Sequence, residues 1–300
     1  MARQNTVWLY GLIEKRPTIK RKDDGEFEFA NFYLHVVRGV RESHDGIRYM
    51  KHDHPLIISM APKTIEKISE LKENDIVMIK GTVSTKGAQK KSSCPNCTDE
   101  NGKPTINMGK GLYTYVTPIF VKKIKECPDY ETALTEIIKA RELSNQVVVT
   151  GNLWNDPKYF LTKKGTLIAQ YQLVTERKFR VEGDSPDNKA DWPWVKSYGD
   201  QAIEDRMRLV KNSTIIVDGF LQERKVIRKT KCKCCGLIYP WKDRTMEIVP
   251  FETEYVKDYK TDAMLESESG QKAEDIRNAL FKHLIKDELT EDMNTDDLNS

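Results

Sequence analysis

The chain has 300 residues, of which 38% are hydrophobic and 32% are charged, and its net charge is +3 at pH 7. This length suits two domains of ordinary size, and the high charged fraction predicts small cores under polar surfaces. The sequence holds no apolar run of 18 residues and begins without the apolar stretch of a signal peptide. These features exclude an integral membrane protein and predict a cytoplasmic location.

The charge is unevenly distributed along the chain. Residues 257–300 contain six basic and twelve acidic residues, so the preceding part carries a net charge of +9. A basic body with an acidic end is typical of proteins that bind a polyanion. An ordinary soluble protein with an acidic tail is the alternative.

The sequence contains two copies of one pattern, separated by 138–140 residues. An interval kept so closely over most of a domain length predicts two copies of one domain. The matched positions are Asn5, Val7, Gly11, Pro17 and Gly25 with Asn145, Val147, Gly151, Pro157 and Gly165; Pro55, Ile65, Glu66, Leu71, Asn74 and Gly81 with Pro193, Ile203, Glu204, Leu209, Asn212 and Gly219; and Cys94 and Cys97 with Cys232 and Cys235.

Each copy predicts five strands, with one helix between the third and the fourth strand. β-Branched and aromatic residues mark the strands, and apolar residues at helical spacing mark the helices near Ile65 and Ile203. The fourth strand is expected to end at Gly81 or Gly219, and a long polar loop, which we call the arm, leads to the fifth. The predicted strands lie at 7–11, 27–37, 56–60, 76–81 and 112–116 in the first copy, and at 147–151, 167–175, 194–198, 215–219 and 246–249 in the second.

This order of elements is that of an oligonucleotide-binding (OB) barrel. We therefore expect an all-β fold with short helices, made of two tandem five-stranded OB-fold barrels, a spacer helix and an acidic C-terminal tail. Asp129 is placed to cap the spacer helix, and residues 287–300 are expected to be disordered. The expected boundaries are 4–125 for the N-terminal barrel, 126–143 for the helical spacer, 144–256 for the C-terminal barrel, and 257–300 for a hydrophilic helix, at 273–289, and the tail.

The second copy also carries a spaced series of motifs. They are Asn145-Gln146-Val147, Gly151-Asn152-Leu153, Asp156-Pro157, Leu173-Val174-Thr175 and the third-strand segment Trp192-Pro193-Trp194-Val195-Lys196-Ser197-Tyr198-Gly199. In this order the motifs resemble those of the bacterial and phage single-stranded-DNA-binding (SSB) protein family, over residues 144–256. The first copy resembles that family mainly through the internal repeat.

The resemblance implies non-catalytic, largely sequence-independent binding of single-stranded DNA in replication, recombination or repair. Such binding needs exposed aromatic rings on which bases stack, and cations that contact phosphates. A place in the barrel core is the alternative for each aromatic. The residues that the resemblance implies are the aromatic Trp192, Tyr198 and Phe179, joined by the neighbouring Trp194, and the basic Arg177 and Lys196.

The first copy departs from this pattern. Val40, His54 and Met60 occupy the positions that correspond to the three stacking residues. We therefore expect the N-terminal barrel to bind DNA more weakly or through a different surface.

The arms are rich in cations. Phosphates on a strand wrapped along the arms would release counterions, so affinity should fall steeply with salt. Solvated loop charge is the alternative. The candidates are Arg224, Lys225, Arg228 and Lys229 in the second arm, and Lys86, Lys90 and Lys91 in the first.

Each arm also carries a Cys-x-x-Cys pair that resembles half of a structural zinc site, which takes four ligands in a tetrahedron. Three arrangements remain open: the arms of one chain share a zinc ion, arms of neighbouring molecules share it, or each pair recruits other ligands. A redox pair and inert thiols are the alternatives to zinc. The candidate ligands are Cys94, Cys97, Cys232 and Cys235, and the spare ones are Cys127, Cys234, His52 and His54.

Single-stranded DNA is the expected partner, with a homodimer as a way to assemble four barrels, and replication or recombination proteins as partners of the acidic tail. Single-stranded RNA binding by the same fold is an alternative, as is a protein-interaction scaffold with inert barrels. An enzyme is not expected, because the sequence has no Walker loop, no His-Glu-x-x-His motif and no nucleophile elbow, and only five histidines.

Overall fold

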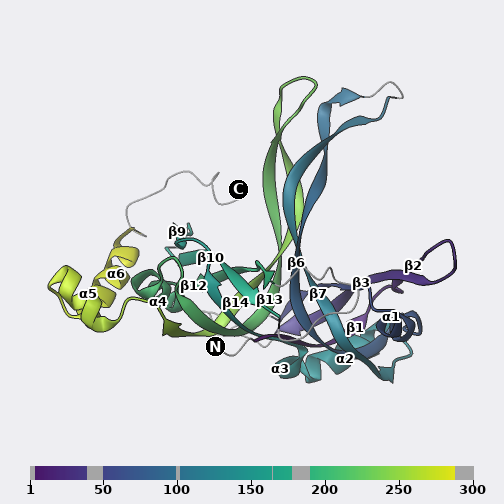
Figure 1. The fold of residues 1–300 in the computed structure, drawn as a ribbon, viewed down its shortest axis with the longest axis horizontal. Coiled ribbons are helices and arrows are strands. Elements are labelled where there is room, and N and C mark those ends of the chain that lie inside the picture. Colours follow the sequence, from purple (N-terminus) through teal and green to yellow (C-terminus); the bar gives the residue numbers. More distant parts are fainter. Residues whose placement is uncertain (1–3, 39–49, 99–101, 164, 178–189, 288–300) are drawn as a thin grey trace.

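The computed structural model describes residues 4–38, 50–98, 102–163, 165–177 and 190–287, and it is built mainly of β-strands (Figure 1). Two barrels lie next to each other, and a pair of long hairpins projects from between them. Within the described ranges, no helix is both long and apolar enough to cross a membrane.

The first barrel is a closed ring of five strands. β1 pairs with β3 and with β6, β3 pairs with β5, β6 pairs with β7, and a parallel contact between β5 and β7 closes the ring. The elements of this half are β1 (Asn5–Ile13), β2 (Thr18–Arg21), β3 (Phe27–Arg38), β4 (Lys51–Asp53), β5 (Leu56–Ser59), α1 (Pro62–Ser69), β6 (Asp75–Thr98) and β7 (Pro104–Glu126).

The second barrel repeats this topology strand for strand. β8 pairs with β10 and β13, β10 with β12, β13 with β14, and β12 with β14 in parallel. The predicted OB order, with a helix between the third and fourth strands, is therefore confirmed in both copies. The elements are β8 (Asn145–Leu153), β9 (Lys158–Leu161), β10 (Leu167–Glu176), β11 (Ala190–Asp191), β12 (Trp194–Tyr198), α4 (Asp200–Arg208), β13 (Thr214–Lys231) and β14 (Ile238–Lys257).

The helices outside the barrels lie at the spacer and after β14. They are α2 (Tyr130–Lys139), α3 (Arg141–Ser144), α5 (Asp262–Ser269) and α6 (Ala273–Asp287). Asp129 caps α2 by accepting a hydrogen bond from the Thr132 amide at 2.8 Å, and Ala133 and Ile137 pack against the first barrel. Of the predicted acidic tail, residues 288–300 lie outside the described residues.

The glycine two residues before the end of each first strand has a steric reason. A Cβ on Gly11 would lie 2.4 Å from the His35 carbonyl oxygen, and one on Gly151 would lie 2.7 Å from that of Val174. Such close approach lets β1 and β8 each pass from one pairing partner to another, and no side chain fits there.

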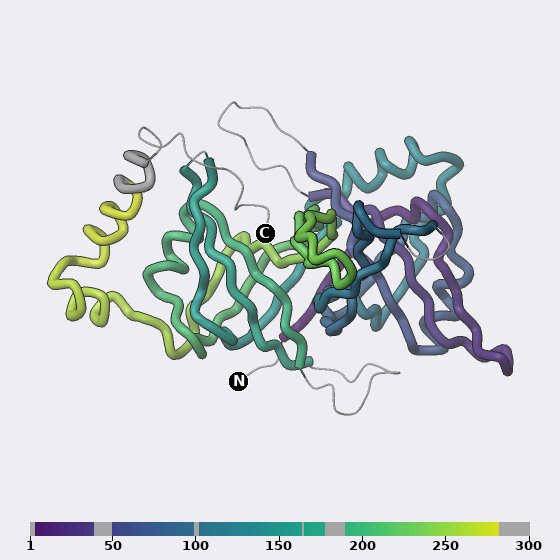
Figure 2. Tube along the Cα trace, turned by 90° about the horizontal axis from the view of Figure 1, so that it is seen from above, coloured from purple at the N-terminus to yellow at the C-terminus, as the bar shows by residue number. Residues whose placement is uncertain are grey.

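The arms differ from the prediction, because they are not loops. β6 continues past Gly81 and β13 continues past Gly219, and each pairs along its length with the returning strand. The two glycines mark register shifts in the ladders, where the strand bends without ending. Each arm is therefore a two-stranded β-ribbon. The two ribbons rise side by side, and in the view from above they lie between the barrels (Figures 1 and 2).

The two barrels share one continuous sheet, because β1 pairs antiparallel with β8. Val7 lies opposite Val147, while Asn5 lies opposite Val149 and Leu9 lies opposite Asn145. Val7 and Val147 are equivalent positions, and the Asn5–Val149 pair is equivalent to the Asn145–Leu9 pair, so the pairing has local two-fold symmetry.

Candidate nucleic-acid interface and cysteine cluster

Strand β12 presents three of the predicted site residues on its outer face. Side chains alternate along a strand, and Val195 and Ser197 are buried in the barrel, which turns Trp194, Lys196 and Tyr198 to the other side. The Lys196 ammonium lies 5.6 Å from the centre of the Tyr198 ring. Burial lowers the pKa of Lys196, and burial followed by the nearby Glu247 carboxylate raises the pKa of Tyr198 to about 12. Lys196 is only 7% exposed, so the expectation that it contacts DNA does not agree with its placement, and the face offers mainly aromatic surface.

Trp192 lies just before β12 begins, so it is not on a regular strand with Trp194. Its side chain is 37% exposed. Its backbone amide donates to the Thr85 hydroxyl at 2.8 Å, and its carbonyl accepts from the Gln172 side chain at 2.8 Å. These contacts fix the backbone of an exposed indole by using one residue from each copy.

Trp154 is an exposed aromatic that the sequence reasoning missed. Its side chain is 54% exposed, and its amide donates to the carbonyl of Gln172, the residue that also contacts Trp192. It directly follows β8, and Glu14 stands at the equivalent position of the first copy. A comparison of the two copies for aromatic residues gained by one of them would have singled it out.

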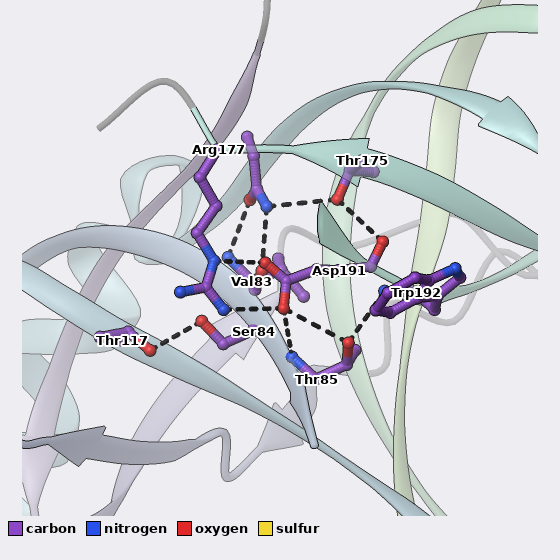
Figure 3. A network of polar contacts seen from close by, with 9 residues as sticks. Val83, Ser84, Thr85, Thr117, Thr175, Arg177, Asp191 and Trp192 are labelled. Carbon is purple, nitrogen blue, oxygen red and sulfur yellow. Dashed lines mark hydrogen bonds and ion pairs between the residues drawn. The ribbon is translucent and has the colours of Figure 1, made fainter. Parts of the chain in front are cut away.

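Asp191, next to Trp192, anchors a polar network between the copies (Figure 3). Its carboxylate is fully buried and forms a two-point ion pair with Arg177. It also accepts a hydrogen bond from the Thr85 amide at 2.7 Å. The expectation that Arg177 contacts a phosphate does not agree with this placement, because its guanidinium is occupied by a buried carboxylate.

The first copy provides a matching contact in the opposite direction. Asp53 pairs with Arg38 at 2.5 Å and accepts from the Glu223 amide of the second arm at 2.9 Å. These three residues are the counterparts of Asp191, Arg177 and Thr85. Each barrel therefore holds the base of the other barrel's arm through one aspartate, Asp53 in the first barrel and Asp191 in the second.

The cations of the second arm divide between its two faces. Arg228 pairs with Asp243, and Arg224 pairs with the buried Glu247. Lys225 and Lys229 alternate with these arginines and are exposed, as Lys231 is. The ribbon thus turns its arginines toward carboxylates and its lysines toward solvent.

The first arm shows the same division. Lys86 and Lys91 are exposed, whereas Lys90 is only 4% exposed and binds Asp243 of the second arm, with contacts of 2.7 and 2.8 Å. The expectation that Lys90 contacts a phosphate is therefore corrected, because this lysine joins the two ribbons. Phe179 and Val40 lie outside the described residues.

The two cysteine pairs meet near the tips of the arms. The sulfur atoms of Cys94, Cys97, Cys232 and Cys235 all lie within 4.8 Å of one another. The Cys94 and Cys235 sulfurs are 3.8 Å apart, and those of Cys97 and Cys232 are 3.9 Å apart. Zinc–sulfur bonds of about 2.3 Å in a tetrahedron put sulfur atoms about 3.8 Å apart. The donor set and its spacing therefore fit one metal ion held within one chain.

The surroundings of the cluster suit thiolate ligands. The Asn107 side-chain amide points at the Cys232 sulfur from 3.5 Å, and Gly236, at φ +74°, closes a tight turn whose amide donates to the Cys232 carbonyl. Hydrogen bonding from the Cys235 backbone amide lowers the pKa of Cys232 to about 6, whereas burial raises the pKa of Cys94 and hydrogen bonding with Cys235 raises that of Cys97. The spare candidates stand elsewhere: Cys234 is exposed, and Cys127 is buried against α2.

Comparison with known proteins adds a sequence match in the second barrel. Residues 144–233 match the family described as the single-strand binding protein family. Over 81 residues the chain is 31% identical to single-stranded DNA-binding protein 2 of Chlorobaculum tepidum. The aligned residues make up 27% of this chain and 55% of that relative. The chain thus spans about half the length of the curated relative that it matches.

The fold is similar to that of the single-stranded DNA binding protein from Thermus aquaticus. A deletion mutant of that protein matches with a TM-score of 0.56 and 14% identity, covering 87% of this chain and 100% of the other. The wild-type structure matches with a TM-score of 0.55 and 14% identity, covering 87% and 97%. This likeness concerns the fold alone, and it extends over both barrels. The sequence similarity to the single-strand binding protein family is thus located in residues 144–233, within the second barrel.

Proposed function

We propose that this protein binds single-stranded DNA without catalysis and largely without sequence preference. The observation that carries the proposal is the aromatic outer face of β12, beside the exposed Trp192, in the barrel that matches the family. Bases stack on such rings whatever their identity, because every base has a π-face.

The exposed lysines of the arms extend this surface. Lys225, Lys229 and Lys231 follow one face of β13, and Lys91 lies exposed on the other ribbon. A strand that leaves the barrel face along a ribbon would meet these three cations in turn, spaced four and then two residues apart. Neutralising phosphates releases counterions, so the affinity would fall steeply as salt rises.

The test is a titration of the full chain with poly-dT at two salt concentrations, followed by tryptophan fluorescence. Quenching with an affinity that falls as salt rises supports stacking on a basic surface. An RNA oligonucleotide of equal length, used as a competitor, separates DNA from RNA binding. The absence of quenching and of binding would contradict the proposal and favour a scaffold role.

We further propose that the cysteine cluster holds one structural Zn²⁺ that joins the two arm tips. The convergence of four sulfur atoms at tetrahedral spacing supports this assignment over a redox pair. Co²⁺ substitution tests it, because thiolate-to-cobalt absorption would appear in the full chain and be lost in Cys94→Ser. Zinc content that is unchanged by this substitution would refute the assignment.

The biological setting that we propose is DNA replication, recombination or repair. A homodimer would assemble four barrels, and the acidic residues 288–300 would recruit replication or recombination proteins. Sedimentation of the full chain, alone and with a cell extract from which bound proteins are identified, tests both parts. A monomer that retains no such protein would contradict them.

A further inference from the structure

A second cluster of metal-binding side chains lies at the mouth of the first barrel. It combines Glu14, which directly follows β1, with His35 of β3 and His54, which follows β4. We propose that these three side chains bind a Zn²⁺-class ion through Glu14 Oε1, His35 Nδ1 and His54 Nε2. This site is separate from the cysteine cluster and does not depend on DNA binding.

The ligand atoms converge as a metal site requires. His35 Nδ1 lies 2.9 Å from Glu14 Oε1, and His54 Nε2 lies 3.5 Å from the same oxygen. Tetrahedral zinc with ligands at about 2.0–2.1 Å separates neighbouring donor atoms by about 3.3 Å. Two imidazoles and one carboxylate are a known zinc ligand set that leaves a fourth position open.

The other ring nitrogen of His35 has a hydrogen-bond partner, whereas that of His54 faces a carboxylate beyond hydrogen-bond distance. His35 Nε2 lies 2.8 Å from His52 Nδ1, and His54 Nδ1 lies 3.7 Å from Glu223 Oε2. Such outer partners orient metal-binding histidines and fix which nitrogen carries the proton. His35 is buried, so its ring is held in place by the surrounding barrel.

The open side of the cluster faces solvent. His54 and Glu14 line a cleft of about 840 Å³ between the first barrel and the base of the second arm. Cationic side chains of Lys15, Arg16 and Arg244 line the same cleft. The fourth position would therefore accept a water molecule or an anionic oxygen.

The placement explains why the two copies differ here. His54 stands where the second copy has Trp192, and Glu14 stands where it has the exposed Trp154. Two aromatic residues of one barrel mouth are thus replaced by two metal ligands in the other. The first barrel has exchanged an aromatic surface for a coordinating one.

The experiment counts zinc in the full chain. Metal-free protein is equilibrated with Zn²⁺, freed of excess by gel filtration and analysed by elemental mass spectrometry. We expect His54→Ala and Glu14→Gln each to lose one zinc ion per chain. His283→Ala, which removes a histidine from α6, is the matched control and should lose none. Circular dichroism confirms that each variant is folded.

Cobalt binding separates the two sites. In His54→Ala the thiolate-to-cobalt absorption of the cysteine cluster should persist, while one equivalent of Co²⁺ without such absorption disappears. Cys94→Ser should show the reverse. Equal metal content in the wild-type protein and in folded His54→Ala would overturn the proposal, whatever the cysteine cluster binds. Loss of zinc in His283→Ala as well would show binding to histidine in general and would equally overturn it.

Discussion

Replacing Asp191 with alanine should weaken the union of the two barrels. The substitution removes the carboxylate that pairs with Arg177 and accepts the Thr85 amide of the first arm. It leaves a guanidinium whose side chain is only 6% exposed without its buried counter-ion. Because Thr85 also receives the Trp192 amide, the change reaches the proposed DNA surface.

The expected loss follows from these contacts. Removing one partner of a buried ion pair typically costs about 3–5 kcal/mol, since the other charge stays buried. An amide left without an acceptor costs about 1–3 kcal/mol. The two terms belong to one network and overlap, so we expect the free energy of unfolding to fall by about 3–5 kcal/mol in total.

Urea denaturation, followed by circular dichroism, measures this loss. Asp53→Ala is the internal control, because Asp53 makes the equivalent contacts from the first barrel. A loss of similar size is expected, because Asp53→Ala likewise leaves a largely buried arginine, Arg38, without its carboxylate. The double substitution Arg177→Met with Asp191→Leu should recover most of the loss, because it leaves no buried charge. A loss below about 1 kcal/mol in Asp191→Ala would refute the reasoning.

Three further predictions concern the DNA surface, pH and the tail. Trp192→Ala should weaken binding of poly-dT about 5- to 150-fold in fluorescence titration, given about 1–3 kcal/mol per stacked base; unchanged affinity would place the ring outside the interface. Buried Asp205 accepts hydrogen bonds from Tyr171 and Tyr255, and burial raises its pKa from 3.8 to about 6. The folded protein therefore binds this proton more tightly than the unfolded chain, so stability should fall by about 3 kcal/mol as pH rises from about 4 to 6. Asp205→Asn should flatten that slope in pH-dependent urea denaturation, and an unchanged slope would assign it to another group. Deleting residues 288–300 should leave or raise DNA affinity in the same titration, and a large loss would contradict competition by the acidic tail.

The barrels could be predicted from local pattern, whereas the arms could not. Alternating apolar residues around Val7 and Val147 identify strands whichever partner they find, and the internal repeat makes each prediction twice. The arms carry polar residues on both faces. The face of each ribbon that packs against the other ribbon makes hydrogen bonds and ion pairs there. Ser92 meets Tyr239 and Lys90 meets Asp243, contacts between residues about 150 positions apart. Strands are predicted from alternating apolar and polar residues, and a strand that is polar on both faces lacks that alternation.

The same distance in sequence limits prediction of the sites. The cysteine spacing revealed two half-sites, but the choice among their arrangements depended on how the arms pack. Arg177 was assigned to the DNA surface because no motif links it to Asp191, the residue with which it forms a buried ion pair. His35 and Glu14 gave no signal either, since neither residue lies in a recognisable ligand spacing. Residue type indicates which side chains can bind a metal or form an ion pair, and the fold determines which of them lie close together.

The β1–β8 pairing has a consequence for how this protein diversified. A symmetric contact between identical subunits obliges both sides to carry the same residues, and it separates on dilution. Here β1 and β8 are separate segments of one chain, so their residues can differ. The spacer also keeps the two segments at a high effective concentration. Either half can then differ from the other, as at the equivalent positions His54 and Trp192. Within one chain, the two sides of a symmetric pairing can therefore carry different residues.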